Sequence, residues 1–314
     1  MPASNPWTSD DMPDLTGKTV IVTGANSGLG REASHQLART GARVVLACRD
    51  LGKAGGVVEG ILALHPGASV AALELDLASL ASVRGFAEKF LSQYGELHVL
   101  CNNAGVMAIP RRETADGFEM QLGTNHLGHF ALTGLLLERL LATSGARIVT
   151  TSSTAHVIGR MRFDDLQSQQ RYRKWGAYGQ SKLANLLFAY ELQRRLAARG
   201  ADAISVACHP GYTATNLQLV GPRMEGSAFS EKLADLATRL LSQDVATGTL
   251  PTLYAAVSPD VSGGDYIGPS DFFGSWGPPT KVESSARSHD AEAAARLWTL
   301  SEEITGVRYA ALAG

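Results

Sequence analysis

The sequence predicts an α/β fold, built as a doubly wound, mainly parallel sheet of seven strands flanked by helices. Short runs rich in β-branched residues alternate with longer segments whose apolar residues recur at helical spacing. The runs are apolar almost throughout, as is typical of strands buried on both faces. Strands that alternate with helices form βαβ units, and the strands of such units are parallel. No repeat or linker divides the 314 residues, so we expect one domain.

Six runs are predicted as strands, and a seventh strand is expected before Gly268. They are Thr19–Thr23, Arg43–Cys48, Val70–Leu75, Leu97–Cys101, Arg147–Thr151, Ala203–Cys208 and Asp265–Ile267. Residues 1–16 are an N-terminal extension, and residues 216–258 are predicted as a substrate-binding lid between the last two strands. Gly274–Thr280 is expected to be a loop, followed by a last helix near Asp290–Ile304.

The composition indicates an ordinary globular protein, with 45% apolar and 18% charged residues. A net charge of −2 without a basic run gives no reason to expect nucleic acid or a membrane surface as partner. The sequence shows neither a signal-peptide pattern nor an apolar run of membrane-spanning length, so a cytoplasmic protein is expected. Cys48, Cys101 and Cys208 are expected to be buried, reduced thiols.

A glycine-rich segment, Thr23–Gly30 (TGANSGLG), follows the first predicted strand and opens a helix. Glycines permit a tight turn there and let the backbone approach a pyrophosphate, which the unpaired N–H groups of the helix N-terminus would bind. The spacing is G-x-x-x-G-x-G rather than the commoner G-x-G-x-x-G, and turns collect glycine for steric reasons alone. The strand–turn–helix setting therefore carries the prediction of a dinucleotide site.

The end of the second strand bears on which dinucleotide binds. It reads Ala47-Cys48-Arg49-Asp50, at the place where a dinucleotide fold meets the adenine ribose. A basic residue there matches the 2′-phosphate of NADP, whereas an acidic one accepts the 2′-hydroxyl of NAD. Because Arg49 comes first, NADP(H) is the predicted cofactor.

Tyr178 and Lys182 are four residues apart and therefore share one face of a helix. A lysine ammonium near a phenol favours the phenolate and lowers its pKa, which suits proton transfer to a developing alkoxide. Taken alone, this spacing also fits a surface pair. Ser153, at the end of the fifth strand, also fits a simple turn.

Together these motifs resemble the short-chain dehydrogenase/reductase family from about Gly17 to Thr215, which implies a Rossmann fold. The resemblance rests on seven motifs in order: Thr23–Gly30, Asp76-Leu77, Asn102–Gly105 (NNAG), Asn125, Ser153, Tyr178 with Lys182, and Pro210-Gly211. Within the family, Ala47–Asp50, Thr124–Phe130 and Ser181–Leu187 look most like retinol dehydrogenases and the WW-domain oxidoreductase.

The resemblance implies a role for each matching residue. Tyr178 would be general acid in reduction and general base in oxidation, and Lys182 would lower its pKa and bind the nicotinamide ribose. Ser153 would hydrogen-bond the substrate oxygen, and Asn125 would hold a water that relays protons from Lys182. The implied cofactor contacts are Gly24, Asn26, Ser27, Gly28, Leu29, Gly30, Arg49, Asp76, Leu77, Asn103, Ala104, Gly105, Tyr178, Lys182, Pro210, Gly211, Thr213 and Thr215.

The predicted function is NADP(H)-dependent interconversion of a carbonyl compound and an alcohol, with a fairly apolar substrate. Two alternatives are a non-catalytic NADP-binding sensor and a light-dependent protochlorophyllide reductase, whose longer insertion before the tyrosine is missing here. Ser153 and Tyr178 are nonetheless 25 residues apart, and the intervening segment is interpreted as pocket wall. His126 and His129 lack further ligands for a metal and are expected to pack. The family usually forms homodimers or homotetramers, although the apolar faces near Leu132–Leu141 and Leu183–Leu192 would also serve a monomer's core.

Overall fold

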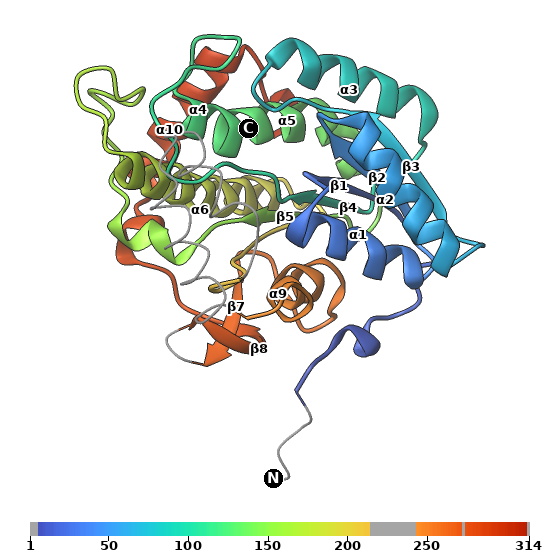
Figure 1. Cartoon of the computed structure of the whole chain (residues 1–314). Helices are drawn as coiled ribbons and strands as arrows, with labels where there is room; N and C mark the ends of the chain where they lie inside the picture. The colour runs from blue at the N-terminus through green and yellow to red at the C-terminus, as the bar shows by residue number, and fades with distance from the viewer. Residues whose placement is uncertain (1–5, 214–242, 272–273, 313–314) are drawn as a thin grey trace, which may run out of the picture.

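The computed structural model describes residues 6–213, 243–271 and 274–312. Within these residues one sheet runs in the order β3-β2-β1-β4-β5-β6-β7-β8, with helices on both faces (Figure 1). The first seven strands are parallel and β8 is antiparallel to β7. The strands are β1 (Thr19–Thr23), β2 (Arg43–Cys48), β3 (Ser69–Glu74), β4 (Val99–Asn102), β5 (Arg147–Thr151), β6 (Ile204–Cys208), β7 (Tyr266–Asp271) and β8 (Trp276–Lys281). The strand order reverses between β1 and β4, where open α/β sheets bind ligands.

Helices α1 (Gly28–Arg39), α2 (Leu51–Leu64) and α9 (Val245–Val257) cover one face of the sheet. Helices α3 (Leu80–Gln93), α5 (Gly128–Ala142), α6 (Lys174–Ala198) and α10 (Ala291–Thr305) cover the other. A π-helical turn, η2 (Gly123–Leu127), joins the short α4 (Met120–Leu122) to α5. Short 3₁₀ turns lie at η1 (Ser9–Asp11), η3 (Thr154–Ile158), η5 (Ala286–His289) and η6 (Ala310–Leu312).

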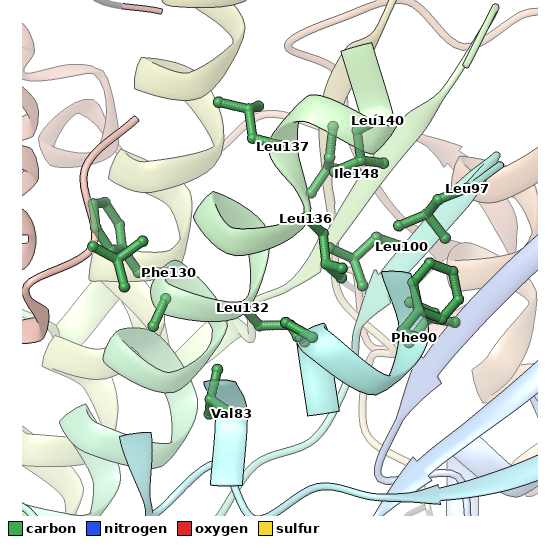
Figure 2. Close-up of a cluster of buried hydrophobic side chains, with 14 of the residues drawn as sticks. Val83, Phe90, Leu97, Leu100, Phe130, Leu132, Leu136, Leu137, Leu140 and Ile148 are labelled. Atoms are coloured by element: carbon green, nitrogen blue, oxygen red, sulfur yellow. The ribbon is translucent and has the colours of Figure 1, made fainter. Parts of the chain in front are cut away.

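Two apolar cores sandwich the sheet, because alternate strand residues point to opposite faces. In β1, Ile21 joins the core under α3 and α5, whereas Val20 and Val22 join the core under α1 and α9. Figure 2 shows the first core, where leucines of α5 meet Phe90 of α3. Strands buried on both faces explain the nearly continuous apolar runs in the sequence.

The sheet has eight strands among the described residues, not the predicted seven. The additional strand is β8, which occupies most of the segment predicted as a loop, Gly274–Thr280. Its sequence Trp276-Gly-Pro-Pro-Thr-Lys281 suggests a loop because proline cannot donate to a ladder. The strand lies at the edge of the sheet, where a proline can be tolerated.

The substrate-binding lid was predicted for residues 216–258, of which residues 216–242 lie outside the described residues. Its described final part is mostly α9, which packs against the sheet and α1 instead of forming a lid. In the N-terminal extension, Trp7 packs edge-on against Tyr254 of α9, with ring centroids 5.2 Å apart. Among the described residues, no helix is both long and apolar enough to cross a membrane.

The apolar faces of α5 and α6, which the sequence allowed either for subunit contacts or for the core of a monomer, belong to the core of the chain. Leu132, Leu136 and Leu186 are fully buried within the chain. Trp298 of α10 packs on Phe130 and Phe188, which belong to α5 and α6. These faces therefore give no argument for association, and the homodimer or homotetramer stays a prediction.

We expect the fold to lose stability below pH 6.5 because it buries histidines in their neutral form, three of them with strongly lowered pKa values. Burial lowers the pKa of His126 to about 3 and those of His129 and His209 to about 4. The unfolded chain binds these protons first, so stability is full above pH 6.5 and is lost as the pH falls toward 4. Each histidine contributes about 1.4 kcal/mol per pH unit to this loss.

Urea denaturation between neutral and acid pH measures the effect. His126→Phe removes one of these titrating groups and keeps an aromatic ring next to Phe130. The stability of the variant should therefore depend less steeply on pH. Equal slopes for the variant and the wild-type protein would contradict this assignment.

Candidate active site

The glycine-rich turn after β1 is held against the end of β4. The Thr23 hydroxyl accepts hydrogen bonds from the backbone N–H groups of Asn103 and Ala104, both at 2.9 Å. The Asn103 amide donates to the Thr23 carbonyl at 2.8 Å. The predicted cofactor residue Asn103 therefore ties the two strands together and also lines the large cavity described below.

His129 extends this network to α5. Its Nδ1 lies 3.0 Å from the carbonyl oxygen of Asn125, and its Nε2 lies 2.9 Å from the Thr23 hydroxyl. Because burial keeps the ring neutral, it carries one proton, so Nδ1–H donates and Nε2 accepts from Thr23. His129 thus joins the glycine-rich turn to the helix of Asn125, a connection that the sequence did not predict.

Two glycines of the turn have no room for a side chain. Gly24 has a φ of +68°, and a Cβ there would lie 3.0 Å from Ala104. A Cβ on Gly30 would lie 2.4 Å from the Gly24 carbonyl oxygen. Ser27, at the N-cap of α1, makes no capping hydrogen bond, so the first N–H groups of α1 keep their capacity for an anion. These features fit a pyrophosphate at the start of α1.

A cavity of about 230 Å³ lies beside this turn, at the ends of β2 and β3. Its lining includes seven of the predicted cofactor contacts: Gly24, Asn26, Arg49, Asp76, Leu77, Ala104 and Gly105. Asp50 lines it too, but its carboxylate caps α2 through the Lys53 N–H at 3.0 Å and ion-pairs with the Lys53 ammonium at 3.1 Å. Arg49 makes no ion pair within the described residues.

A larger cavity of about 500 Å³ lies at the ends of β4, β5 and β6 and shares Gly105 with the first. The predicted residues that line it are Leu29, Asn103, Gly105, Ser153, Tyr178, Lys182, Pro210, Gly211 and Thr213. Thr215 lies outside the described residues. Ser27, Gly28 and Gly30 belong to the adjoining turn and the start of α1.

Tyr178, Ser153 and Lys182 meet at this cavity. Tyr178 is buried, and Ser153 lines the same cavity close enough for its hydroxyl to lower the pKa of the phenol. The Lys182 ammonium lies 5.9 Å from the centroid of the Tyr178 ring and donates to the Thr151 carbonyl at 3.0 Å. Ser152 fixes the same turn of α6, because its hydroxyl donates to the Lys182 carbonyl at 2.8 Å. The helical spacing thus brings both predicted side chains to one cavity.

The pKa of Tyr178 differs from the prediction. Burial raises it to about 12, and the Ser153 hydrogen bond, which lowers it, only partly compensates. Burial also lowers the pKa of Lys182 to about 8. Desolvation therefore outweighs the expected effect of the lysine on the phenol, and the phenol is protonated at neutral pH.

Asn125 is fully buried behind the cavity and is not among its lining residues. Its Oδ1 accepts from the Val106 N–H at 2.8 Å, and its Nδ2 donates to the Val106 carbonyl and to the Ser181 hydroxyl, each at 2.9 Å. Asn125 therefore positions the loop after β4 and one turn of α6. The water relay expected at Asn125 stays a prediction.

The long segment between Ser153 and Tyr178 forms pocket wall only at its two ends. Thr154, Ala155, Ile158, Lys174 and Trp175 line the large cavity. Loop residues that the sequence did not single out, Met107 and Ala108, complete the opposite wall. Their place depends on the path of the loop, which is fixed by Gln121 accepting from the Ala108 N–H at 2.7 Å.

Comparison with known proteins agrees with this geometry. The family model for short chain dehydrogenase matches residues 18–223. The chain belongs to the short-chain dehydrogenase family. It is therefore an oxidoreductase by family, as the motifs predicted.

The chain is 42% identical to mouse retinol dehydrogenase 12 over 300 residues, which cover 94% of this chain and 88% of the mouse protein. It is also 42% identical to human retinol dehydrogenase 13, with 93% and 86% covered. The crystal structure of an uncharacterized protein from Mycobacterium paratuberculosis superposes with a TM-score of 0.79 at 44% identity, covering 97% of this chain and 99% of that one. The predicted likeness to retinol dehydrogenases is confirmed.

Proposed function

We propose that this short-chain dehydrogenase interconverts a carbonyl compound and an alcohol with NADP(H) as cofactor. The observation that carries the proposal is the meeting of Tyr178, Ser153 and Lys182 in a cavity that shares Gly105 with the smaller cavity lined by Arg49. A cofactor bound across both cavities would have the proposed proton donor near one end and the cation of Arg49 near the other.

Bound across the two cavities, NADPH would supply the hydride. Tyr178 donates the proton from its Oη to the substrate oxygen, since its raised pKa keeps the phenol protonated. The Ser153 hydroxyl, which lines the same cavity as Tyr178, orients the same oxygen. Lys182 is mostly protonated at pH 7, and its positive charge stabilises the negative charge that develops when Tyr178 gives up its proton.

The preference for NADP over NAD is proposed from the charges after β2. Asp50, the group that would accept a ribose hydroxyl, is engaged by Lys53 and the first turn of α2. Arg49 lines the same cavity with its guanidinium available for a 2′-phosphate.

We expect Arg49→Ala to lower the ratio of NADPH to NADH affinity by about tenfold or more, because it removes a charge-assisted contact. Titration of each nucleotide by fluorescence measures the ratio. Arg43→Ala is the matched control, since Arg43 is exposed at the opposite end of the same strand. An unchanged ratio in Arg49→Ala would show that the selectivity comes from elsewhere.

An apolar substrate is proposed from the mouth of the large cavity. Ile158, Trp175 and Tyr212 line the cavity and are 58%, 50% and 40% exposed. Large apolar side chains left in water at a cavity entrance mark a surface that an apolar ligand would cover. Retinal belongs in the substrate panel because the named relatives are retinol dehydrogenases.

The test is oxidation of NADPH, followed by fluorescence, on adding a panel of apolar aldehydes and ketones. The proposal predicts turnover of at least some members. Tight binding of NADPH with no turnover across a broad panel would instead identify a non-catalytic NADP sensor.

A further inference from the structure

A third cavity, of about 360 Å³, lies beside the start of α6. Four arginines line it: Arg160, Arg162, Arg171 and Arg173. We call it the arginine pocket. It adjoins the large cavity lined by Tyr178, which we call the catalytic cavity, because Ile158 lines both.

The positive charge of the arginine pocket is largely uncompensated. Arg162 pairs with Asp165 at 3.0 Å, and that carboxylate also accepts three backbone N–H groups, from residues 169, 170 and 171. Arg160, Arg171 and Arg173 make no ion pair within the described part of the chain and are exposed. Asp164, the other carboxylate of the segment, is not a lining residue. Guanidinium groups gathered without counter-charge in one concavity fit an anion.

The first turn of α6 adds to this. Gly176 and Ala177 line the arginine pocket, and Arg173 at the N-cap makes no side-chain capping bond. The N-terminus of this helix, which runs from Lys174 to Ala198, carries the positive end of the helix dipole, which favours negative charge nearby.

Backbone strain is found at both cavities. Among the described residues only two other than glycine have positive φ, Ser168 at 47° and Ala108 at 49°. Ser168 lines the arginine pocket, and Ala108 lines the catalytic cavity. Such strain gathers at ligand sites, where surrounding structure holds it in place.

We propose that the arginine pocket binds the phosphate group of a substrate whose carbonyl end enters the catalytic cavity past Ile158. The planar fork of arginine matches a phosphate with two hydrogen bonds, and several such forks suit a doubly charged group. The shared Ile158 gives the apolar body of the substrate a surface to cross. This assignment of substrate class rests on the proposed carbonyl reduction.

The first experiment measures binding without turnover. Calorimetry follows pyrophosphate binding to the protein saturated with NADP⁺, so that the anion cannot bind at the cofactor site. We expect saturable binding that weakens about tenfold or more in the combined variant Arg160→Gln, Arg171→Gln, Arg173→Gln. Arg199→Gln, an exposed arginine at the other end of α6, should bind as the wild-type protein does. Absent binding, or binding equal in the combined variant, would overturn the site.

The second experiment compares medium-chain aldehydes that end in a phosphate with counterparts that end in a hydroxyl. The wild-type enzyme should favour the phosphate in kcat/KM by about tenfold or more, and the combined variant should bring this ratio toward one. Equal use of both by the wild-type enzyme would overturn the substrate assignment, with pyrophosphate binding then marking a site for free phosphate or for a lipid headgroup. Turnover of neither aldehyde would count against the carbonyl reduction, while the calorimetry still decides on the anion site.

Discussion

Tyr178→Phe should reduce NADPH-dependent carbonyl reduction about a thousandfold, because the variant lacks the phenol that lines the catalytic cavity together with Ser153 and Lys182. The ring itself stays, so its edge-on packing against Trp175 is kept. Affinity for NADPH should change little, since the glycine turn and Arg49 are untouched. Steady-state assays measure kcat, and fluorescence titrations with NADPH measure the affinity for the cofactor separately.

The matched control is Tyr190→Phe, three turns further along α6. Its hydroxyl bonds Ser284 at 2.8 Å, away from the lining of either cavity, so its activity should stay close to that of the wild-type enzyme. If Tyr178→Phe kept activity within about tenfold of wild type, proton donation by this residue would be wrong.

Lys182→Met should abolish most activity and at the same time stabilise the fold. Activity should fall about a hundredfold or more, because the cation that favours loss of the Tyr178 proton is gone. The free energy of unfolding at pH 7 should rise by about 3 kcal/mol, since the buried ammonium holds its proton at a pKa of about 8 rather than its ordinary 10.5. The Thr151 carbonyl keeps a donor, because Asn185 also bonds it at 2.9 Å.

The pH dependence of this gain is a further check. A lowered folded pKa means that the wild-type protein gains stability as the pH rises from about 8 toward 10.5. The advantage of Lys182→Met should therefore shrink over that range. Lys89→Met, at an exposed position of α3, should alter stability by no more than about 0.5 kcal/mol. A variant at Lys182 that is less stable than wild type at pH 7 would contradict the cost assigned to the buried charge.

The sequence predicts the parallel part of the sheet well, because strands buried on both faces leave unbroken apolar runs. β1, β2 and β5 have the predicted bounds, and β4 begins at Val99 instead of Leu97. β8 was missed because Gly277, Pro278 and Pro279 are typical of loops, and only its edge position makes a strand possible. α9 was placed in a lid because a helical pattern does not say which surface the helix covers.

For the site, the motifs predict which side chains come together but not their environment. The spacing of Tyr178 and Lys182 places them on one helix face, yet the depth of burial that raises the tyrosine pKa depends on the packed cavity. The bonds of Asn125 to Val106 and Ser181 arise from a loop path that no local pattern encodes. The arginine pocket likewise brings Arg160 and Arg173 together only through the fold of the segment between them.

The most direct test of the proposed reaction is transfer of label from NADPH in which both hydrogens at the reactive carbon of its nicotinamide are deuterium. With an accepted aldehyde or ketone, the wild-type enzyme should place deuterium on the carbon that was the carbonyl, and its alcohol product should carry the label. Tyr178→Phe should bind the labelled cofactor and form almost none of this alcohol. Cofactor that binds but never passes deuterium to any member of a broad carbonyl panel would contradict the reaction proposed for this site.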